Sequence, residues 1–493
     1  MANNEPIASH SNRVSNQQPY YTKANKNTLL GVLATGLSLV INAIIMPILV
    51  VRFGADNWAR YSFFSLYVAV LSFVESSLQL YTSQLTATAK SNVYDYEWKN
   101  DKNIFGLYLL MLVIAGGILA LNGAFGLTKD TNLNYILTLA LFNMFPRAIS
   151  STVKGTLQGQ NSQIKYYAVT TLLNLCRPLF LLLLILLLKP NIITLVIFYV
   201  IYSLVEMTVY LWLKDPPETP SSEPKANHSS DLHLLLPLLT SNGLSVLTAN
   251  LDKLLVFGSA SLISASNYTF ASTLAGLLYI FVNVAIGSYG PKFKELFLRD
   301  NQEKMKEYFY KLSFINNLLI MLAIAGFYFL GSWVMQPLSK KIDIKNVIDT
   351  FLYLGLASLL SSNLWVPGII ATSMGKATFS VKTNFLFILI YLVCYNEIVK
   401  YHGPFVFAKS MLISAAVTGI VGMYHFRYKI LNISMSRYVL LSILYPVLLV
   451  GVLITPFWCL NRFFNSFWVN LTYLGVVSFA IGGAWIRYKS STK

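Results

Sequence analysis

The chain has 493 residues, of which 55% are hydrophobic and only 12% are charged. A soluble protein carries roughly 25% charged residues, so these proportions exclude a soluble globular protein, which could not cover its water-facing surface. The net charge of +17 would suggest nucleic-acid binding in a soluble chain. Here most lysines and arginines lie in short segments between apolar runs, where such charges set membrane orientation. We therefore expect an all-α integral membrane protein with no nucleic-acid partner.

The apolar runs can be taken in chain order. Residues 1–27 are polar and predict a disordered cytoplasmic tail. A bilayer-spanning helix needs about 20 apolar residues, and fourteen runs approach or exceed this length. They cover residues 28–50, 61–84, 104–126, 132–154, 166–188, 192–213, 233–257, 264–290, 312–336, 347–371, 383–400, 405–425, 438–458 and 467–486. The sequence thus predicts 12–14 transmembrane helices: twelve in a core and a C-terminal pair.

A polar segment, 214–231, divides these runs after the sixth. Its content of proline, serine and charged residues is typical of a flexible linker. We predict an N-terminal six-helix lobe over 28–213, a cytoplasmic linker over 214–231 and a C-terminal six-helix lobe over 232–425. A helix pair and tail occupy 426–493.

The two predicted lobes resemble each other in sequence. The first run of each lobe ends on Phe-Gly, at Gly54 and Gly258, and the next opens on Tyr-Ser-Phe or Tyr-Thr-Phe. A small-residue turn follows the fourth run of each lobe, around Gly159 and Gly375. Because both lobes start on the same side, this duplication is parallel, and such proteins place a substrate cavity between the lobes.

Lysine and arginine asymmetry predicts the orientation of these spans. With an even number of spans both termini share one side, which carries most of the basic residues, including six in the expected loop 292–311. Both termini are therefore expected in the cytoplasm. The loop 337–346, with three lysines on the predicted outer side, argues against this orientation.

Catalytic and cofactor motifs are missing from the sequence. We find no dinucleotide or phosphate-loop motif, no HExxH and no GxSxG. The three cysteines lie in apolar runs without Cys or His partners, which indicates neither a disulfide framework nor a zinc site. We therefore expect a transporter without a cofactor or metal, and not an enzyme.

Ionisable side chains inside spans are costly and usually functional. Five stand out: Arg147, Arg177 and Lys253 as cations, and Glu75 and Asp252 as carboxylates. Arginine holds phosphate through two parallel hydrogen bonds, so the cations predict a cavity for an anionic substrate such as a diphosphate. The carboxylates would carry a coupling proton. The alternative is that the charges only form ion pairs inside the bundle, with Glu206 as a further partner.

With these features the chain resembles Wzx-type O-antigen flippases, in the polysaccharide-transport branch of the multidrug/oligosaccharidyl-lipid/polysaccharide exporter (MOP) superfamily. The resemblance covers about 28–425. It is carried by VVRFGADNWARYSFFSL, by GTLQGQNSQIKYY, by ANLDKLLVFGSASLISASNYTFASTLA and by Pro291-Lys292-Phe293. The chain departs from its relatives at Trp58-Ala59-Arg60, where they often carry Tyr-Gly.

The resemblance implies two six-helix lobes in the V shape of MATE and MurJ proteins, in a bacterial inner membrane. It implies movement of an undecaprenyl-diphosphate-linked oligosaccharide from the cytoplasmic to the periplasmic leaflet, coupled to H⁺ or Na⁺. Besides the lipid-linked oligosaccharide and membrane lipids, it implies a polysaccharide polymerase and a chain-length regulator as partners. Gly54, Gly258 and Pro291 would act as hinges or gates.

Three other functions are considered beside this one. The first is an H⁺- or Na⁺-coupled multidrug antiporter on the same scaffold, which the mixture of basic residues in the spans disfavours. The second is a polysaccharide polymerase or ligase, for which we find no long outer loop with catalytic residues. The third is a membrane scaffold without transport activity, which the duplication and the charges inside spans disfavour.

Overall fold

The computed structural model describes residues 18–91, 102–125, 131–159, 163–188, 191–213, 232–259, 261–287, 289–336, 342–376, 378–398 and 404–464. These residues are helical apart from short turns and connections, as a chain must be when lipid cannot satisfy backbone hydrogen bonds. The first helices are α1 (Gln18–Ser91), α2 (Lys102–Phe125), α3 (Thr131–Gly159), α4 (Gln163–Leu188) and α5 (Ile192–Trp212). The next are α6 (Leu232–Ser259), α7 (Leu262–Gly287), α8 (Gly290–Leu298), α9 (Gln302–Val334), α10 (Ile344–Ser362) and α11 (Trp365–Ser373). The last are α12 (Thr378–Ile398), α13 (Pro404–Lys429), α14 (Met435–Tyr438), the π-helix η5 (Val439–Leu444) and α15 (Tyr445–Phe464).

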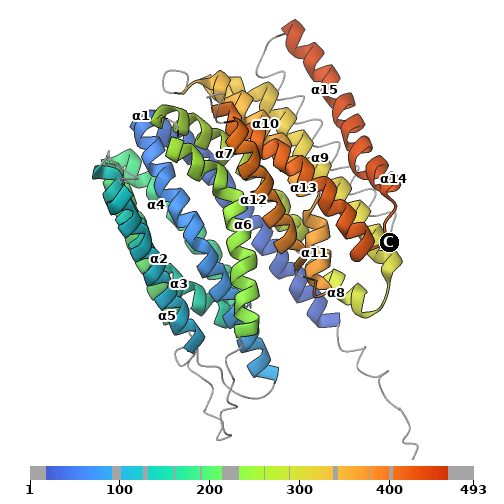
Figure 1. Ribbon diagram of the computed structural model, residues 1–493, viewed down its shortest axis with the longest axis horizontal. Coiled ribbons are helices and arrows are strands. Elements are labelled where there is room, and N and C mark those ends of the chain that lie inside the picture. The colour runs from blue at the N-terminus through green and yellow to red at the C-terminus, as the bar shows by residue number, and fades with distance from the viewer. Residues whose placement is uncertain are drawn as a thin grey trace, which may run out of the picture.

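The first two predicted spans are both contained in α1, which is broken at Gly54. This glycine has φ +79° and ψ 174°, a conformation that glycine adopts without the penalty a Cβ would bring. The chain turns back there, and the second span begins within a few residues. The prediction of a helix end at Phe53-Gly54 is therefore confirmed. We refer to this side of the bundle, at the top of Figure 1, as the Gly54 end.

Most of the predicted spans coincide with helices of the structure. Helices α2 to α7, α9, α12 and α13 each match one predicted run, and α10 with α11 matches the run at 347–371. Three expectations need comment. The loop expected at 292–311 is helical over most of its length, as α8 and the start of α9. Helix α1 begins at Gln18, before the predicted boundary at residue 28. The run at 467–486 lies outside the described residues.

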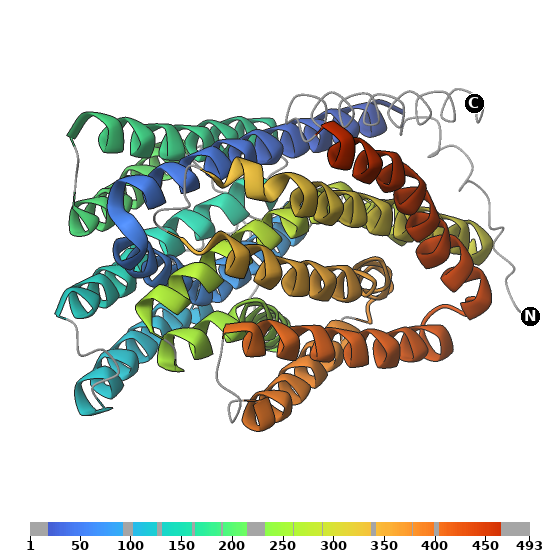
Figure 2. The same ribbon diagram turned by 90° about the horizontal axis from the view of Figure 1, so that it is seen from above.

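Helix α1 lies between two groups of helices. It packs against α3 and α4 on one side and against α6 and α7 on the other. Figures 1 and 2 show α2 to α5 gathered beside its blue ribbon, and α10, α12 and α13 on the opposite flank. We call α1–α5 the N-terminal half and α6–α15 the C-terminal half. The predicted lobe boundaries stay predictions.

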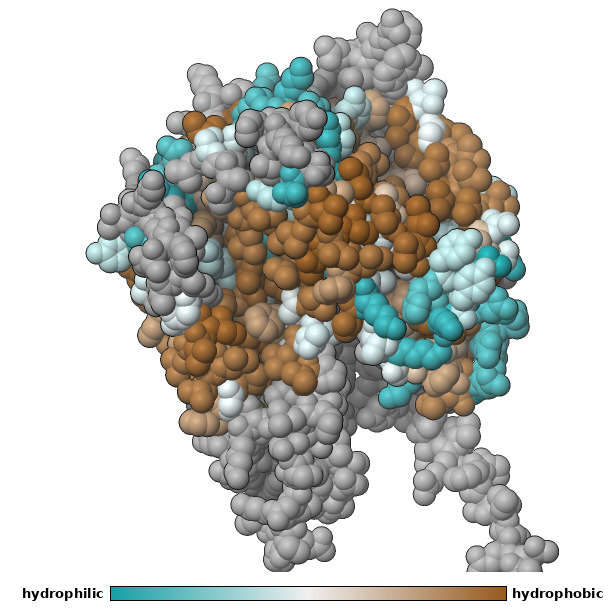
Figure 3. All heavy atoms as spheres, in the orientation of Figure 1, coloured by the Kyte–Doolittle hydropathy of each residue, from teal (hydrophilic) through white to brown (hydrophobic). Residues whose placement is uncertain are grey.

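The outer surface of the bundle suits a lipid environment. Nine segments among the described residues are long and apolar enough to cross a membrane, among them Asp56–Ser83, Ile192–Trp212 and Phe405–Lys429. Large apolar side chains such as Leu187 and Val452 are 75% and 69% exposed. Figure 3 shows a broad hydrophobic surface across the middle of the molecule, with hydrophilic residues gathered below it on the side of α8. The chain is a multi-pass membrane protein with an all-α fold.

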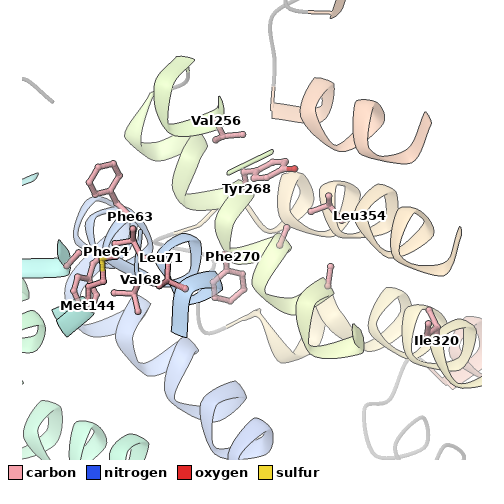
Figure 4. Close-up of a cluster of buried hydrophobic side chains, with 14 of the residues drawn as sticks. Phe63, Phe64, Val68, Leu71, Met144, Val256, Tyr268, Phe270, Ile320 and Leu354 are labelled. Carbon is pink, nitrogen blue, oxygen red and sulfur yellow. The ribbon is translucent and has the colours of Figure 1, made fainter. Parts of the chain in front are cut away.

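The core that holds α1 in place is aromatic and aliphatic. Figure 4 shows Phe63, Phe64 and Leu71 of α1 beside Met144 of α3, with Phe270 of α7 on the other side. All five side chains are buried. The same span of α1 therefore contributes to the packing of both halves.

The C-terminal helices are fixed to α9 by buried amides. The Asn317 side chain donates to the Asn363 side chain at 2.8 Å and also to the backbone carbonyl of Ser442 in η5. The Tyr438 hydroxyl donates to the same Asn363 oxygen at 2.7 Å. Because hydrogen bonds in an apolar interior are costly to leave unmade, this network holds η5 against α9.

Candidate functional site

The first charged pair joins α3 to α1. Arg147 Nη2 lies 2.9 Å from Glu75 Oε2, with side-chain exposures of 21% and 9%. The two helices run close together below this pair, where the Thr82 hydroxyl donates to the Thr152 carbonyl at 3.2 Å. The ion pair weighed in the sequence analysis therefore forms, and it holds Arg147 at a fixed position in the N-terminal half.

A second pair lies two helical turns further along α3. Lys154 donates to Glu206 of α5, and its Nζ lies 4.9 Å from the centre of the Tyr210 ring. The Tyr210 and Thr170 hydroxyls are 2.7 Å apart. The sequence analysis did not select Lys154, because it stands at the end of the run 132–154. Lys154 follows Arg147 by seven residues, which places both side chains on one face of α3. This spacing could have identified Lys154 as a candidate from the sequence.

The third cation lies over an aromatic ring. The Arg177 guanidinium on α4 lies 4.8 Å from the centre of the Tyr199 ring on α5, a cation–π geometry. It also interacts electrostatically with Glu206 and Tyr61. Arg177, Arg147, Lys154, Glu75 and Glu206, here called the cation cluster, thus combine three positive and two negative side chains in the N-terminal half.

The carboxylate of the C-terminal half has a different setting. Asp252 on α6 is 1% exposed, and its Oδ2 accepts a hydrogen bond of 2.7 Å from the Tyr268 hydroxyl on α7. Its Oδ1 and the hydroxyl of nearby Tyr391 on α12 have no hydrogen-bond partner among the described residues. One oxygen of this carboxylate therefore makes no side-chain hydrogen bond to the described residues, and the adjacent Lys253 is the cation that acts on it.

Lys253 is the remaining cation expected to line the cavity. Its Nζ donates to the Asn250 side chain at 3.1 Å, one turn earlier on the same helix. The structure brings Arg147 and Arg177 into one cluster but does not pair Lys253 with them among the contacts of the described residues. Its role in a cavity stays a prediction.

The three expected hinge residues lie at helix ends or breaks. Gly54 breaks α1, Gly258 lies in the last turn of α6, and Pro291 lies in the first turn of α8, where the missing N–H of proline is tolerated. These positions are compatible with hinges, and motion at them stays a prediction.

No family model matches the sequence, and no protein of curated function matches it. Solved structures do resemble it. A multidrug resistance MATE family transporter of the MOP superfamily, in its inward-facing conformation, matches with a TM-score of 0.65 at 14% identity, over 80% of this chain and 94% of that one. The outward-facing conformation of such a transporter matches with a TM-score of 0.59 at 12% identity, over 82% and 95%.

A third structure extends further along the chain. The lipid II flippase MurJ, in an inward closed conformation, matches with a TM-score of 0.63 at 11% identity, over 94% of this chain and 100% of that one. The chain therefore shares the fold of these transporter structures. The resemblance expected from the sequence is confirmed as far as this fold, and the Wzx-type assignment stays a prediction.

Proposed function

We propose that the protein moves a lipid-linked oligosaccharide, joined through a diphosphate, from one leaflet of the bacterial inner membrane to the other. The observation that carries this proposal is the cation cluster. Among the described residues its three cations face two carboxylates, so one positive charge is left there in a part of the bundle where charge is costly. An anionic substrate group would compensate that charge, whereas a cationic drug would be repelled.

Arginine chemistry supports a diphosphate as the anionic group. The guanidinium forms two parallel hydrogen bonds with phosphate oxygens. We propose that a phosphate first meets Arg177, which the Tyr199 ring holds without a carboxylate ion pair among the described residues. It then competes with Glu75 for Arg147, because a dianion attracts the guanidinium more strongly than a single carboxylate.

This exchange suggests how transport is coupled to an ion. When the substrate takes Arg147, Glu75 loses the cation that compensates its burial, and an unpaired buried carboxylate is unfavourable. We propose that Glu75 then takes up a proton and returns it when the substrate leaves. Asp252, whose Oδ1 makes no side-chain hydrogen bond to the described residues, is the second candidate, for H⁺ or Na⁺.

The length of the MurJ match favours the flippase over the multidrug antiporter, although the MATE match has the slightly higher TM-score, 0.65 against 0.63. The matched region includes almost the whole chain for the MurJ flippase, but about four-fifths of it for the MATE transporters. The lipid-linked substrate of the named neighbour suggests the same class here. We further propose that both termini are cytoplasmic and that the Gly54 end faces the periplasm.

The first test is rescue of surface polysaccharide in a flippase-null host that makes the matching glycan. Rescue with loss of the accumulated lipid-linked intermediate supports the proposal. Arg177→Ala should then fail to rescue while reaching normal membrane levels. Arg437→Ala is the matched control, because Arg437 lies over the Tyr310 ring in similar geometry, 5.1 Å from its centre, but outside the cluster.

Two results would contradict the proposal. The first is membrane expression without rescue, together with drug export. The second is rescue by Arg177→Ala that equals rescue by the parent. Drug susceptibility of the same strains would test the antiporter directly.

A further inference from the structure

The contact of α1 with α6 and α7 joins the two halves, and we call it the seam. At the Gly54 end the seam is aromatic. Trp58 of α1 meets Phe270 of α7 edge to face, with ring centres 6.0 Å apart. Phe63 of α1 meets Phe257 of α6 in the same way at 5.5 Å.

Further along α1, toward its C-terminal end, the seam is hydrogen-bonded. The Asn242 amide of α6 donates to the Ser77 hydroxyl at 3.0 Å. That hydroxyl lies 3.4 Å from the Leu238 carbonyl. Gly243 packs closely there, since a Cβ on it would meet the Phe73 ring at 3.5 Å. The polar side chains of this part of the seam therefore satisfy one another across the two halves.

The polar atoms at the Gly54 end are not satisfied in this way. Trp58 Nε1, Ser62 Oγ and Ser266 Oγ are buried and have no hydrogen-bond partner among the described residues. Ser62 follows Trp58 by one helical turn on α1, and Ser266 precedes Phe270 by one turn on α7. Residues one turn apart share a helix face, so these hydroxyls lie on the faces that meet at the seam.

Closing the seam at this end therefore has an opposing cost. In the closed seam these atoms make no hydrogen bond to the described residues, whereas water would reach each of them in an open seam. The favourable contribution comes from aromatic packing. At the Gly54 end, aromatic packing favours closure and the unpartnered polar atoms oppose it. At Ser77 and Asn242, packing and hydrogen bonding both favour closure.

We infer that Trp58, Ser62 and Ser266 set the conformational balance of the protein by keeping the closed seam weak at the Gly54 end. The closed state is then only modestly favoured, and a ligand can shift it with a small differential affinity. This inference rests on the alternating opening of the proposed function, but not on the identity of its substrate.

The test measures how often the seam opens without substrate. Cys176, Cys394 and Cys459 are replaced by serine, and Ala59→Cys provides one reporter thiol. Ala59 is 0% exposed and stands one turn before Phe63 on α1, so a thiol-specific, membrane-impermeant maleimide reaches it only when the seam opens. The reagent is added on the side of the Gly54 end, and the labelling rate is followed.

Ser266→Ala is the decisive variant, because it removes an unpartnered hydroxyl with little change in volume. It should slow labelling by roughly fivefold or more, since satisfying or removing one buried polar atom shifts such an equilibrium by this order. Ser62→Ala should act in the same direction. Ser264→Ala is the matched control: its hydroxyl lies 3.0 Å from that of Ser261 at an exposed position of the same helix, and its labelling rate should equal that of the parent.

Unchanged or faster labelling in both Ser266→Ala and Ser62→Ala would overturn the inference, as would a parent protein that is never labelled. Glycan rescue is scored separately on the same membranes. Slower labelling in a protein that rescues no glycan would leave this inference standing and remove the substrate proposal. If the parent rescues the glycan fully but Ser266→Ala and Ser62→Ala are labelled at the parent rate, the substrate proposal stands and this inference is removed.

Discussion

The N-terminal and C-terminal halves break their helices at corresponding positions but carry different polar chemistry. Arg147 precedes Gly159 by twelve residues, and Asn363 precedes Gly375 by twelve. In the N-terminal half that position holds a charged pair, Arg147 with Glu75. In the C-terminal half it holds an amide that accepts from Asn317 and Tyr438. Under the proposed function, the N-terminal half binds an anion while the C-terminal half supplies rigidity and a single carboxylate.

The largest expected effect comes from Arg147→Ala, which removes a cation of the cation cluster in the N-terminal half. Transport should be lost because the phosphate site loses its central guanidinium. Stability should also fall by about 3–5 kcal/mol, since Glu75 is left buried without a cation. Glycan rescue and thermal unfolding of the purified protein measure the two effects.

The double variant Glu75→Gln with Arg147→Ala separates these effects. Removing the unpaired charge should restore most of the stability and none of the transport. If the double variant transports normally, Arg147 is a structural residue and the contrast between the halves loses its functional meaning.

Asp252→Asn tests the carboxylate of the C-terminal half. The amide oxygen can still accept from the Tyr268 hydroxyl, so stability should change little, while the charge that a coupling ion would compensate is gone. If Asp252, the second candidate, carries the coupling ion, transport should lose its dependence on the ion gradient, because a charge buried in the membrane-spanning bundle is then missing. Initial rates in vesicles with and without a pH or Na⁺ gradient measure this, and unaltered gradient dependence would assign coupling to Glu75 instead.

Gly155→Ala probes how closely the N-terminal half is packed. A Cβ at this position would lie 1.9 Å from Thr82 Oγ1 and 2.3 Å from the Gln79 carbonyl oxygen, so α1 and α3 must separate. Overpacking of this kind costs about 1–3 kcal/mol. Gly116→Ala on α2 is the control, because nothing lies within 4 Å of its added methyl group. Equal unfolding temperatures for the two variants would contradict the close approach.

The smallest expected effect is that of Ala371→Gly, at the position in the C-terminal half that corresponds to Gly155. Ala371 precedes Gly375 by four residues, as Gly155 precedes Gly159, and it is fully buried. Here a methyl group is accommodated, so its removal should cost about 1–2 kcal/mol, the sum of the helix penalty of glycine and the lost burial of one methyl group. No loss of stability, or a gain, in chemical denaturation would mean that the methyl group is as crowded at Ala371 as it would be at Gly155.

The spans were predictable from sequence because each is a separate apolar run. The breaks at Gly54 and Gly375 were predictable from the Phe-Gly ending and the small-residue turn, and both glycines have positive φ in the structure. Which charged side chains pair with each other could not be predicted from the sequence. Arg147 and Glu75 could be nominated singly, but which carboxylate each cation meets depends on helix rotation. Lys154 was missed because a lysine at the end of an apolar run normally extends to the membrane surface. Its contact with Glu206 depends on where α5 lies. The unpartnered atoms of the seam depend on packing alone.

The π-helix η5 has a consequence for how the protein is made. Its Ser442 carbonyl takes a hydrogen bond from the Asn317 amide of α9, so two segments synthesised far apart in time complete each other. Until η5 leaves the ribosome, the Asn317 amide lacks this acceptor and α9 is incompletely anchored. Co-translational insertion should therefore leave a half-finished C-terminal half that a membrane chaperone or protease can recognise. Once the last helices are inserted and η5 packs against α9, the chaperone or protease would no longer recognise the chain.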